Sequence, residues 1–504
     1  MRHNASGGGG PEGPSSKGFP CRKALAAAPA PSAGLWRAWL ACVHDLRPAC
    51  PRLRTFWWVA VALLGLCTRA DPGGVAAWVR GAGLKGACYK PLLRLFEGPA
   101  VKADALARRW VPCVLARFRP VEAAGHRVAV LDGLKVPKEG RRMPGVRALH
   151  QASQNNSKPP FIMGHSFQAV GLLAEAGAGT VCVPLASRLH EGVNAGAGDG
   201  PTLPSKAVAL FLEVAGLLEK PVLLVADAYY CTRTVVDPVV AAGHHLLTRV
   251  RANGVAWCPP PPPPARRGRG RPRLYGAKVR LRDAWDGPGF KAAPSPAYGE
   301  KNVTIQYLCR DLLWRPGARP LRFVWVDHPT RGRAVFATTH TGLDPLDIVR
   351  LYALRFKVEV SFKAALHTVG AYAHRFWMKG MRPTRRREKD RALDAFPADQ
   401  RAKVLAKLAA YDLHAQLGCV AQGLLQHLAV HHRAEVWARF RGWMRTMRPD
   451  AVPSEAVAAH ALRAALPEFL LADGARTDTE KFLRDRVDWE RAPGIAMHPD
   501  AADG

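Results

Sequence analysis

The stretch Pro221-Val-Leu-Leu-Val-Ala-Asp227-Ala-Tyr-Tyr230 is a run of apolar residues that ends abruptly in a carboxylate. A continuous apolar run of this length, following a helix-like segment, predicts a central parallel-type strand. The carboxyl ends of such strands are where α/β sheets hold their ligands and their chemistry. Taken alone, Asp227 is more typical of a residue that caps the following helix.

Two further acids favour a catalytic interpretation. Arg127-Val-Ala-Val-Leu-Asp132 repeats the pattern of an apolar run that ends in an acid, and Glu359 lies on a later predicted helix. The predicted order is three strands, helix, strand, helix, strand, at 127–132, 161–172, 180–188, a helix capped by Ser205, 221–227, a helix near Asp237-Pro238, and 245–250. This order resembles the ribonuclease-H-like fold, in which the first and fourth strands are neighbours. The resemblance implies that Asp132 and Asp227 lie side by side.

The composition indicates a polyanionic partner. The 504 residues include 73 Lys plus Arg against 40 Asp plus Glu, a formal net charge of +33. An excess spread along the whole chain favours nucleic acid, with a membrane surface as the weaker alternative. The apolar run 56–67 lies between two arginines and is too short to span a bilayer, so it predicts a buried helix.

The cysteines point to a reducing compartment. Eleven are present, with no C-x-x-C pair and no His/Cys ligand spacing, which excludes a zinc ribbon or a disulfide framework. We therefore expect a cytoplasmic protein.

The N-terminal part predicts a tail and then helices. Residues 1–34 are rich in Gly, Ala, Pro and Ser and are expected to be disordered. Further on, a helix starting at Asp71-Pro72, a glycine turn and a second helix closed by Gly98-Pro99 are compatible with a DNA-binding helix-turn-helix. An ordinary helical hairpin fits the same pattern equally well.

Basic residues gather in two other places. A loop after the first strand carries Lys138 and Arg142, which we expect, like Lys363, to bind DNA by neutralising backbone phosphates. A run of six prolines is followed by an Arg-Gly-Arg-Pro segment with Arg269 and Arg271, which resembles an AT-hook for a narrow minor groove. A solvated run of charges is the alternative. Strands predicted at 278–285, 302–314, 321–327 and 334–339 make most of this region a β-rich insertion.

The last acid lies on a charged helix opened by Asp344-Pro345. Arg355, Glu359 and Lys363 follow one another at i,i+4 spacing and share one face. A surface ladder of ion pairs is the structural alternative. Beyond about residue 379 the chain is basic and helical, and the tail after Ala472 is expected to be peripheral.

Three carboxylates gathered in one place suit phosphoryl transfer. Their oxygens are hard ligands that bind Mg²⁺ or Mn²⁺. Two such ions about 3.5–4 Å apart activate an attacking oxygen and stabilise a leaving one. Neither a nucleophile elbow nor a Walker loop occurs in the sequence.

Three motifs together resemble the bacterial insertion-sequence transposases of the DDE type, the cut-and-paste class with a β-rich insertion. They are Val130-Leu-Asp132-Gly, Val225-Ala-Asp227-Ala-Tyr-Tyr230 and Tyr352-x-x-Arg355-Phe-Lys-Val-Glu359-Val-Ser-Phe-Lys363, within 56–377. The resemblance implies that Asp132, Asp227 and Glu359 are catalytic and bind two Mg²⁺ or Mn²⁺ ions. It implies that Tyr352 and Arg355 contact DNA phosphates, and that a homodimer assembles on double-stranded DNA near the bacterial nucleoid.

The expected fold is α/β, a ribonuclease-H-like mixed sheet with flanking helices, a β-rich insertion and helical N- and C-terminal regions. The expected parts are a tail at 1–34, a helical DNA-binding region at 35–120, the first part of the catalytic core at 121–251, the insertion at 252–335, the rest of the core at 336–378, and a basic helical region at 379–504.

Two positions depart from that family. Its lysine seven residues after the glutamate is Leu366 here, with Lys363 one turn after Glu359 as a substitute. The Arg-Gly that commonly follows its second acid is Ala228-Tyr229 here. Two alternatives to a transposase stay open: a ribonuclease-H-like nuclease without strand transfer, and a transposase-derived DNA-binding protein that has lost catalysis.

Overall fold

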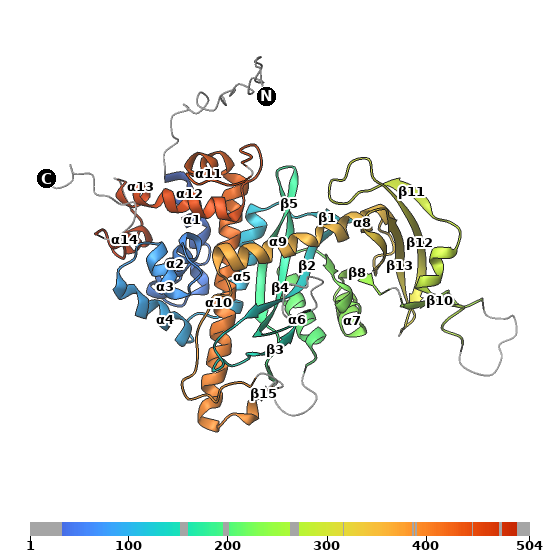
Figure 1. The fold of residues 1–504 in the computed structure, drawn as a ribbon, viewed down its shortest axis with the longest axis horizontal. Coiled ribbons are helices and arrows are strands. Elements are labelled where there is room, and N and C mark those ends of the chain that lie inside the picture. The colour runs from blue at the N-terminus through green and yellow to red at the C-terminus, as the bar shows by residue number, and fades with distance from the viewer. Residues whose placement is uncertain are drawn as a thin grey trace, which may run out of the picture.

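One long sheet joins a helical body at one end of the molecule to a β-rich insertion at the other (Figure 1). The computed structural model describes residues 33–151, 160–194, 201–251, 253–262, 272–315, 317–385, 388, 391–445, 447–472 and 476–490. The predicted tail at 1–34 lies almost wholly outside the described residues, as do Arg269 and Arg271 of the AT-hook-like segment.

The centre of the sheet has the ribonuclease-H-like strand order. Its five strands lie side by side as β5-β4-β2-β7-β8. β2 is antiparallel to β4 and parallel to β7, and β7 is parallel to β8. Their bounds are β2 His126–Pro137, β4 Phe161–Ala176, β5 Gly179–Leu189, β7 Val222–Ala226 and β8 His245–Val250. The predicted fold class and the predicted neighbours are confirmed.

Alternation along the central strands gives the sheet two apolar faces. Because successive side chains point to opposite faces, Ala129 and Leu131 pack into one core with helices α6 (Leu203–Ala215) and α7 (Arg233–Ala241). Val128 and Val130 pack into another with α8 (Pro345–Leu354) and α9 (Phe356–Ala364). Both faces are dry, which explains the continuous apolar runs. Ser205 does not cap α6; Thr202 does, and its side chain accepts from the Ser205 N–H.

The insertion continues the same sheet and has its own small core. β14 pairs antiparallel with β8, and β13 and β12 follow outward. Its strands are β9 Val255–Trp257, β10 Lys278–Arg280, β11 Lys291–Pro294, β12 Thr304–Trp314, β13 Arg319–His328 and β14 Gly332–Thr338. The strand predicted at 278–285 is too long, because a 3₁₀ turn at Leu281–Asp286 follows β10. Buried Trp325 binds that turn, with its Nε1 donating to the Leu281 carbonyl at 2.8 Å.

The N-terminal helices surround an apolar helix. They are α1 Ala33–His44, α2 Leu53–Thr68, α3 Val75–Gly81, α4 Tyr89–Glu97 and α5 Ala103–Arg117. α2 contains the apolar run 56–67 and is buried over most of its length, as predicted. None of the described helices is both long and apolar enough to cross a bilayer. The helix start predicted at Asp71-Pro72 is wrong: α3 begins after Gly74, and Asp71 instead ion-pairs with Arg80 at 2.9 Å.

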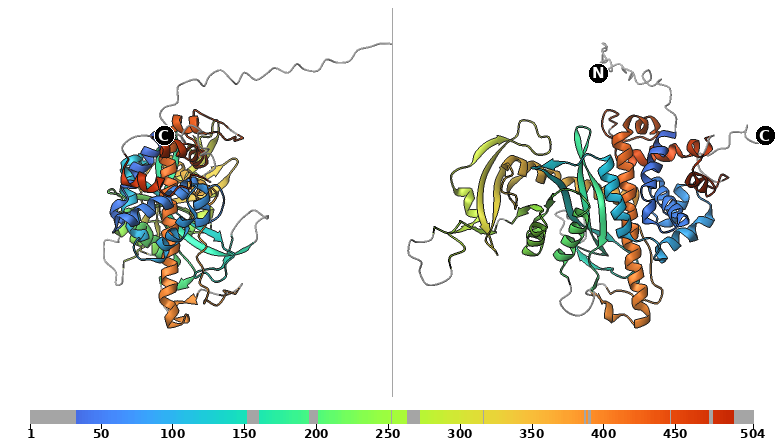
Figure 2. Two further views of the ribbon diagram at one scale, coloured as in Figure 1. Left: turned by 90° about the vertical axis from the view of Figure 1, so that its left-hand side faces the viewer. Right: turned by 180° about the vertical axis from the view of Figure 1, so that it is seen from behind.

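The C-terminal helices complete this body. The long helix α10 (Ala398–His431) runs between the sheet and the N-terminal helices and packs on β5, α2 and α5 (Figure 2). The other helices are α11 Arg433–Arg439, α12 Glu455–Ala464, α13 Leu466–Leu471 and α14 Asp478–Arg484. The tail after Ala472 is not peripheral, because Phe482 stacks on Trp57 with ring centroids 4.9 Å apart and Val487 bridges to Leu84. Short strands β1, β3, β6 and β15 lie at Glu122–Ala123, Arg147–His150, Val193–Asn194 and Arg391–Ala392.

A glycine allows α10 to lie close to α5, which gives a stability prediction. A Cβ added at Gly423 would lie 2.1 Å from Cζ2 of Trp110. That ring is 1% exposed and its Nε1 donates to the Pro184 carbonyl at 2.8 Å, so it has little room to move. Overpacking costs about 1–3 kcal/mol, which exceeds the roughly 1 kcal/mol that alanine gains over glycine in a helix. We expect Gly423→Ala to lower the melting temperature.

The matched control is Gly86→Ala, since a Cβ added there meets no atom within 4 Å. Its stability should change by no more than about 0.5 kcal/mol. Equal melting temperatures for the two variants would contradict this packing argument.

Candidate active site

Two acids lie where the parallel pairing of the neighbouring strands β2 and β7 stops. The predicted end of the first strand at Asp132 is wrong, because β2 continues to Pro137 along β4. Leu131 on β2 pairs with Ala226 on β7, so the next residues, Asp132 and Asp227, are side by side. Asp132 has the same strand parity as Val130, and Asp227 the same parity as Val225, so both acids face the side of the sheet that α8 and α9 cover. The predicted juxtaposition of these two acids is present.

Each acid is also held by a local backbone donor. Asp132 Oδ1 accepts from the Gly133 N–H at 2.8 Å. Asp227 Oδ1 accepts from the Tyr229 N–H at 2.8 Å and caps the 3₁₀ turn η3 (Ala228–Tyr230). The capping interpretation of Asp227 is therefore correct, and it is compatible with a second role because the other carboxylate oxygen is not used by the cap.

The third acid comes from a pair of helices rather than from one. Asp344 caps α8 as predicted, with Oδ1 accepting from Leu346 N at 2.8 Å. The helix then breaks at Arg355, and Glu359 lies in the first turn of α9. The single helix expected from the sequence is thus two, and Arg355 lies at the junction.

Arg355 links the acids across the chain. Its Nη1 donates to Asp132 Oδ2 at 2.7 Å, and its Nη2 donates to Glu359 Oε1 at 2.9 Å. The predicted i,i+4 pair between Arg355 and Glu359 is present. No ion pair joins Glu359 to Lys363 in the part of the chain that the structure describes, and Lys363 is exposed. One guanidinium therefore gathers acids that lie 223 and 4 residues away.

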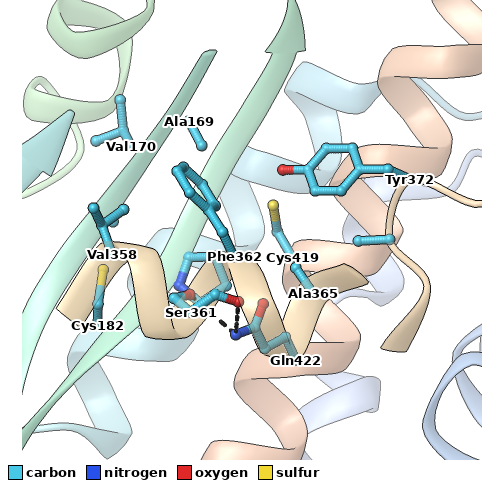
Figure 3. Close-up of a pocket in the computed structure, with 13 residues that line it drawn as sticks. Ala169, Val170, Cys182, Val358, Ser361, Phe362, Ala365, Tyr372, Cys419 and Gln422 are labelled. Carbon is cyan, nitrogen blue, oxygen red and sulfur yellow. Dashed lines mark hydrogen bonds between the residues drawn. The ribbon is translucent and has the colours of Figure 1, made fainter. Parts of the chain in front are cut away.

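A buried polar contact fixes α9 on the long C-terminal helix. Gln422 of α10 donates through Nε2 to the Ser361 carbonyl and to Ser361 Oγ, both at 3.0 Å. Figure 3 shows these two bonds beside Val358 and Phe362, which point from α9 toward the sheet residues Ala169 and Val170. Ser361 and Gln422 are buried, so water does not compete for these hydrogen bonds. The bonds therefore fix the part of α9 that carries Glu359.

The site has the electrostatics of a cation-binding pocket. Burial raises the pKa of Asp132 to about 6, and the charges of Asp227 and Glu359 add to this rise. The Arg355 guanidinium and the Gly133 N–H oppose it. Carboxylates that lie close together repel one another, and a bound cation offsets this repulsion. In this structure the cation is the Arg355 guanidinium, which binds Asp132 and Glu359.

The donor set fits hard divalent ions, with a rearrangement. Carboxylate oxygens on rigid strands are the ligands that Mg²⁺ and Mn²⁺ prefer. The three acids are not among the described groups whose ligand atoms all lie within 4.8 Å of one another. The Arg355 guanidinium lies between Asp132 and Glu359, so ion binding requires it to move.

Sequence reasoning missed a polar layer next to the acids. The Tyr230 hydroxyl hydrogen-bonds to the side-chain amide of Gln168. Gln168 lies on β4 next to Ala169, the residue that pairs with Asp132. Burial and then the charges of Asp132 and Asp227 raise the pKa of this Tyr230. Thr248 of β8 donates to the Asp227 carbonyl at 2.8 Å. Tyr230 lies in the sequence motif around Asp227, whereas no local sequence pattern points to Gln168 or Thr248.

The residues predicted to contact DNA have different surroundings. Tyr352 is half-buried against Phe336, with ring centroids 4.6 Å apart. Arg142 is exposed and donates to the Lys379 carbonyl at 2.9 Å. The Lys138 ammonium binds within the protein, because it donates to the carbonyls of Tyr372 and His374. Burial lowers the pKa of Lys138 to about 7.

A comparison with protein families identifies the family to which the chain belongs. Residues 53–311, just over half of the chain, match a family described as DDE superfamily endonuclease. This range includes Asp132 and Asp227 and ends before Glu359.

Two other comparisons add little. A cryo-EM structure of a piggyBac transposase synaptic complex with hairpin DNA is 8% identical, covering 90% of this chain and 84% of that one, with a TM-score of 0.36. No curated protein sequence matches the chain.

Proposed function

Since the chain belongs to the DDE superfamily of endonucleases, we propose that it is a transposase that cleaves DNA at the ends of its own insertion sequence and joins the freed 3′-hydroxyl to a target. The observation that carries this proposal is the link from Arg355 to both Asp132 and Glu359, beside Asp227 at the neighbouring strand position. Acids far apart in the chain are brought to one place.

Asp132, Asp227 and Glu359 would hold two Mg²⁺ or Mn²⁺ ions. When bound, such ions activate an attacking water or 3′-hydroxyl and stabilise the leaving oxygen of a phosphodiester. Strand β2 and the end of β7 supply two rigid ligands, and α9 supplies the third. Arg355, once released from the acids, is placed to donate to a phosphate of the scissile strand, as a planar fork suits that geometry.

Other residues would bind and orient the DNA. The net charge of +33 favours a polyanion. Lys363 and Arg142 are exposed cations that would neutralise DNA phosphates. Tyr352 lies beside Arg355, whose Cζ is 5.9 Å from the centre of the Tyr352 ring. Tyr229, 43% exposed next to Asp227, offers a ring on which a base could stack. A homodimer would bring two ends together.

The test is a strand-transfer assay with the full chain, Mn²⁺, and DNA that carries the sequences on both sides of the gene, in which terminal inverted repeats are expected. Nicking at the repeat ends followed by joining of a precut 3′-end is the expected result. Cleavage without joining would identify a nuclease of this fold instead. Repeat-specific binding without any nicking would identify a DNA-binding protein derived from a transposase.

Acidic pH should weaken metal-dependent cleavage. The pKa of Asp132 is about 6, and a protonated carboxyl is a poor metal ligand, so the Mn²⁺ concentration for half-maximal rate should rise by up to about tenfold per pH unit below that value. A Mn²⁺ requirement that is constant between pH 5 and 7 would contradict this.

The raised pKa of Asp132 should also make the stability of the fold depend on pH, but acidic pH should stabilise the metal-free fold while it weakens cleavage. The pKa of Asp132 is raised in the fold, so its proton stabilises the folded state below about pH 4, and this contribution is lost as pH rises through about 6. The metal-free protein should therefore gain more from added Mn²⁺ at pH 7 than at pH 5, which a thermal shift at each pH would measure.

A further inference from the structure

Three histidines lie close together at one end of the central strands, and the acids lie toward the other end. His126 begins β2, His245 begins β8, and His340 follows β14. Each offers one ring nitrogen, and the three nitrogens lie within 4.8 Å of one another. Among the described residues, this is the one group of three histidine, cysteine or acidic side chains that meets this condition.

The backbone holds the three rings in place. His245 and His126 share the strand parity of Leu247 and Val128, so they face the same side of the sheet. His340 joins them because β14 runs antiparallel to β8, and Thr339 N donates to the Leu246 carbonyl at 3.0 Å. The ring centroids are 4.5–5.0 Å apart.

The outer hydrogen bonds of the rings resemble those of metal ligands. His126 Nδ1 donates to the Ala124 carbonyl at 2.8 Å, which leaves its Nε2 as a free base. His245 Nδ1 hydrogen-bonds to Thr339 Oγ1 at 3.0 Å. Such a bond on the far nitrogen orients a metal-binding imidazole. His340 Nδ1 accepts a longer bond of 3.2 Å from Gly342 N–H.

We propose that His126, His245 and His340 bind one divalent transition-metal ion of the Zn²⁺ class, with water as the fourth ligand. Imidazole nitrogens suit Zn²⁺, Co²⁺ and Ni²⁺, whereas Mg²⁺ takes oxygen ligands. Zn–N bonds of about 2.0–2.1 Å place tetrahedral ligands roughly 3.3 Å apart, so the rings close by small rotations. His340 gives up its bond from Gly342 if it binds through Nδ1.

The charges around the rings are compatible with a cation. At pH 7.5 an ordinary imidazole is mostly neutral, which is the form that binds metals. Arg322 is a charged group that acts on His340, and its guanidinium is paired with Asp311 at 2.8 Å. An ion here would tie the strand that returns from the insertion to the first strand of the core, and it would do so whether or not the proposed DNA chemistry is correct.

The test is Co²⁺ titration of the purified full chain after chelator treatment, read by visible absorption, with excess Mg²⁺ to occupy the acids. One Co²⁺ per chain with the absorption of a tetrahedral site, displaced by Zn²⁺, is expected. His126→Ala and His340→Ala should each weaken binding by more than about 10- to 100-fold, the effect of losing even an outer-shell partner. His150→Ala, at an exposed site on β3, should bind like the parent.

Controls separate this site from the acids and from misfolding. Asp132→Asn should retain the tetrahedral Co²⁺ signal. His126→Gln tests the same ligand with a polar side chain of similar length, and circular dichroism confirms that each variant is folded. Parent-like Co²⁺ affinity in folded His126→Ala and His340→Ala, or loss of the signal in Asp132→Asn, would overturn the proposal.

Discussion

Asp227→Asn is expected to abolish DNA cleavage while leaving the fold and DNA binding intact. Asn retains the side-chain oxygen that caps η3, so the bond from Tyr229 N can persist. What is lost is the negative charge that would bind a divalent ion. Metal stabilisation of a phosphoryl-transfer transition state is worth several kcal/mol, so the rate should fall by more than about 10³-fold. Initial rates of Mn²⁺-dependent nicking measure this effect.

A matched substitution shows whether the loss is specific to the site. Asp347 lies on α8 and ion-pairs with Arg350 at 2.9 Å, without contact to the other acids. Asp347→Asn should nick DNA at the rate of the parent. Asp132→Asn and Glu359→Gln should match Asp227→Asn. Parental nicking by a folded Asp227→Asn protein would remove the basis for a carboxylate-metal site.

The acids on strands could be predicted because local pattern determines where they lie. An apolar run that ends in an acid places Asp227 directly after its strand, and places Asp132 directly after the buried run 128–131 of β2, a strand that continues to Pro137. The order of elements then makes these strands neighbours. The strand parity that puts both side chains on one face is a property of the backbone, so the juxtaposition follows from two short segments.

The remaining features depend on long-range packing. The pair between Arg355 and Glu359 could be predicted from i,i+4 spacing, but the pair between Arg355 and Asp132 depends on how α8 and α9 lie on the sheet. The basic loop around Lys138 predicts that this residue binds DNA, yet backbone carbonyls distant in the sequence accept its hydrogen bonds. The contact of Phe482 with Trp57 and the meeting of three histidines join segments with no common local pattern.

Arg355→Ala is expected to shift metal affinity and cleavage rate in opposite directions. Arg355 neutralises Asp132 and Glu359, so its removal leaves carboxylates that repel one another. Breaking a buried pair from one side costs about 3–5 kcal/mol, and we expect roughly 1–3 kcal/mol here because the Arg355 and Asp132 side chains are each 18% exposed. The metal-free variant should melt at a lower temperature than the parent.

Divalent ions should compensate for this loss of stability. Mn²⁺ no longer competes with a guanidinium, so its apparent affinity should rise by about tenfold or more, equivalent to at least about 1.4 kcal/mol. Cleavage at saturating Mn²⁺ should nevertheless fall by about 10²–10³-fold, the effect of losing one preorganised donor to the reacting phosphate. Thermal shifts and nicking rates over a Mn²⁺ series measure the two quantities separately.

Arg350→Ala is the control for Arg355, because Arg350 lies on the adjoining helix and its pair with Asp347 is largely exposed. Exposed pairs contribute about 0–1 kcal/mol, so this variant should keep the parental Mn²⁺ dependence and rate. Arg355→Lys keeps the charge but loses the planar fork, and should lie between the parent and Arg355→Ala. If Mn²⁺ affinity were unchanged in Arg355→Ala, the guanidinium would not occupy a place that ions need. Arg355 would then act on DNA alone, and the acids would have to bind their ions without its displacement.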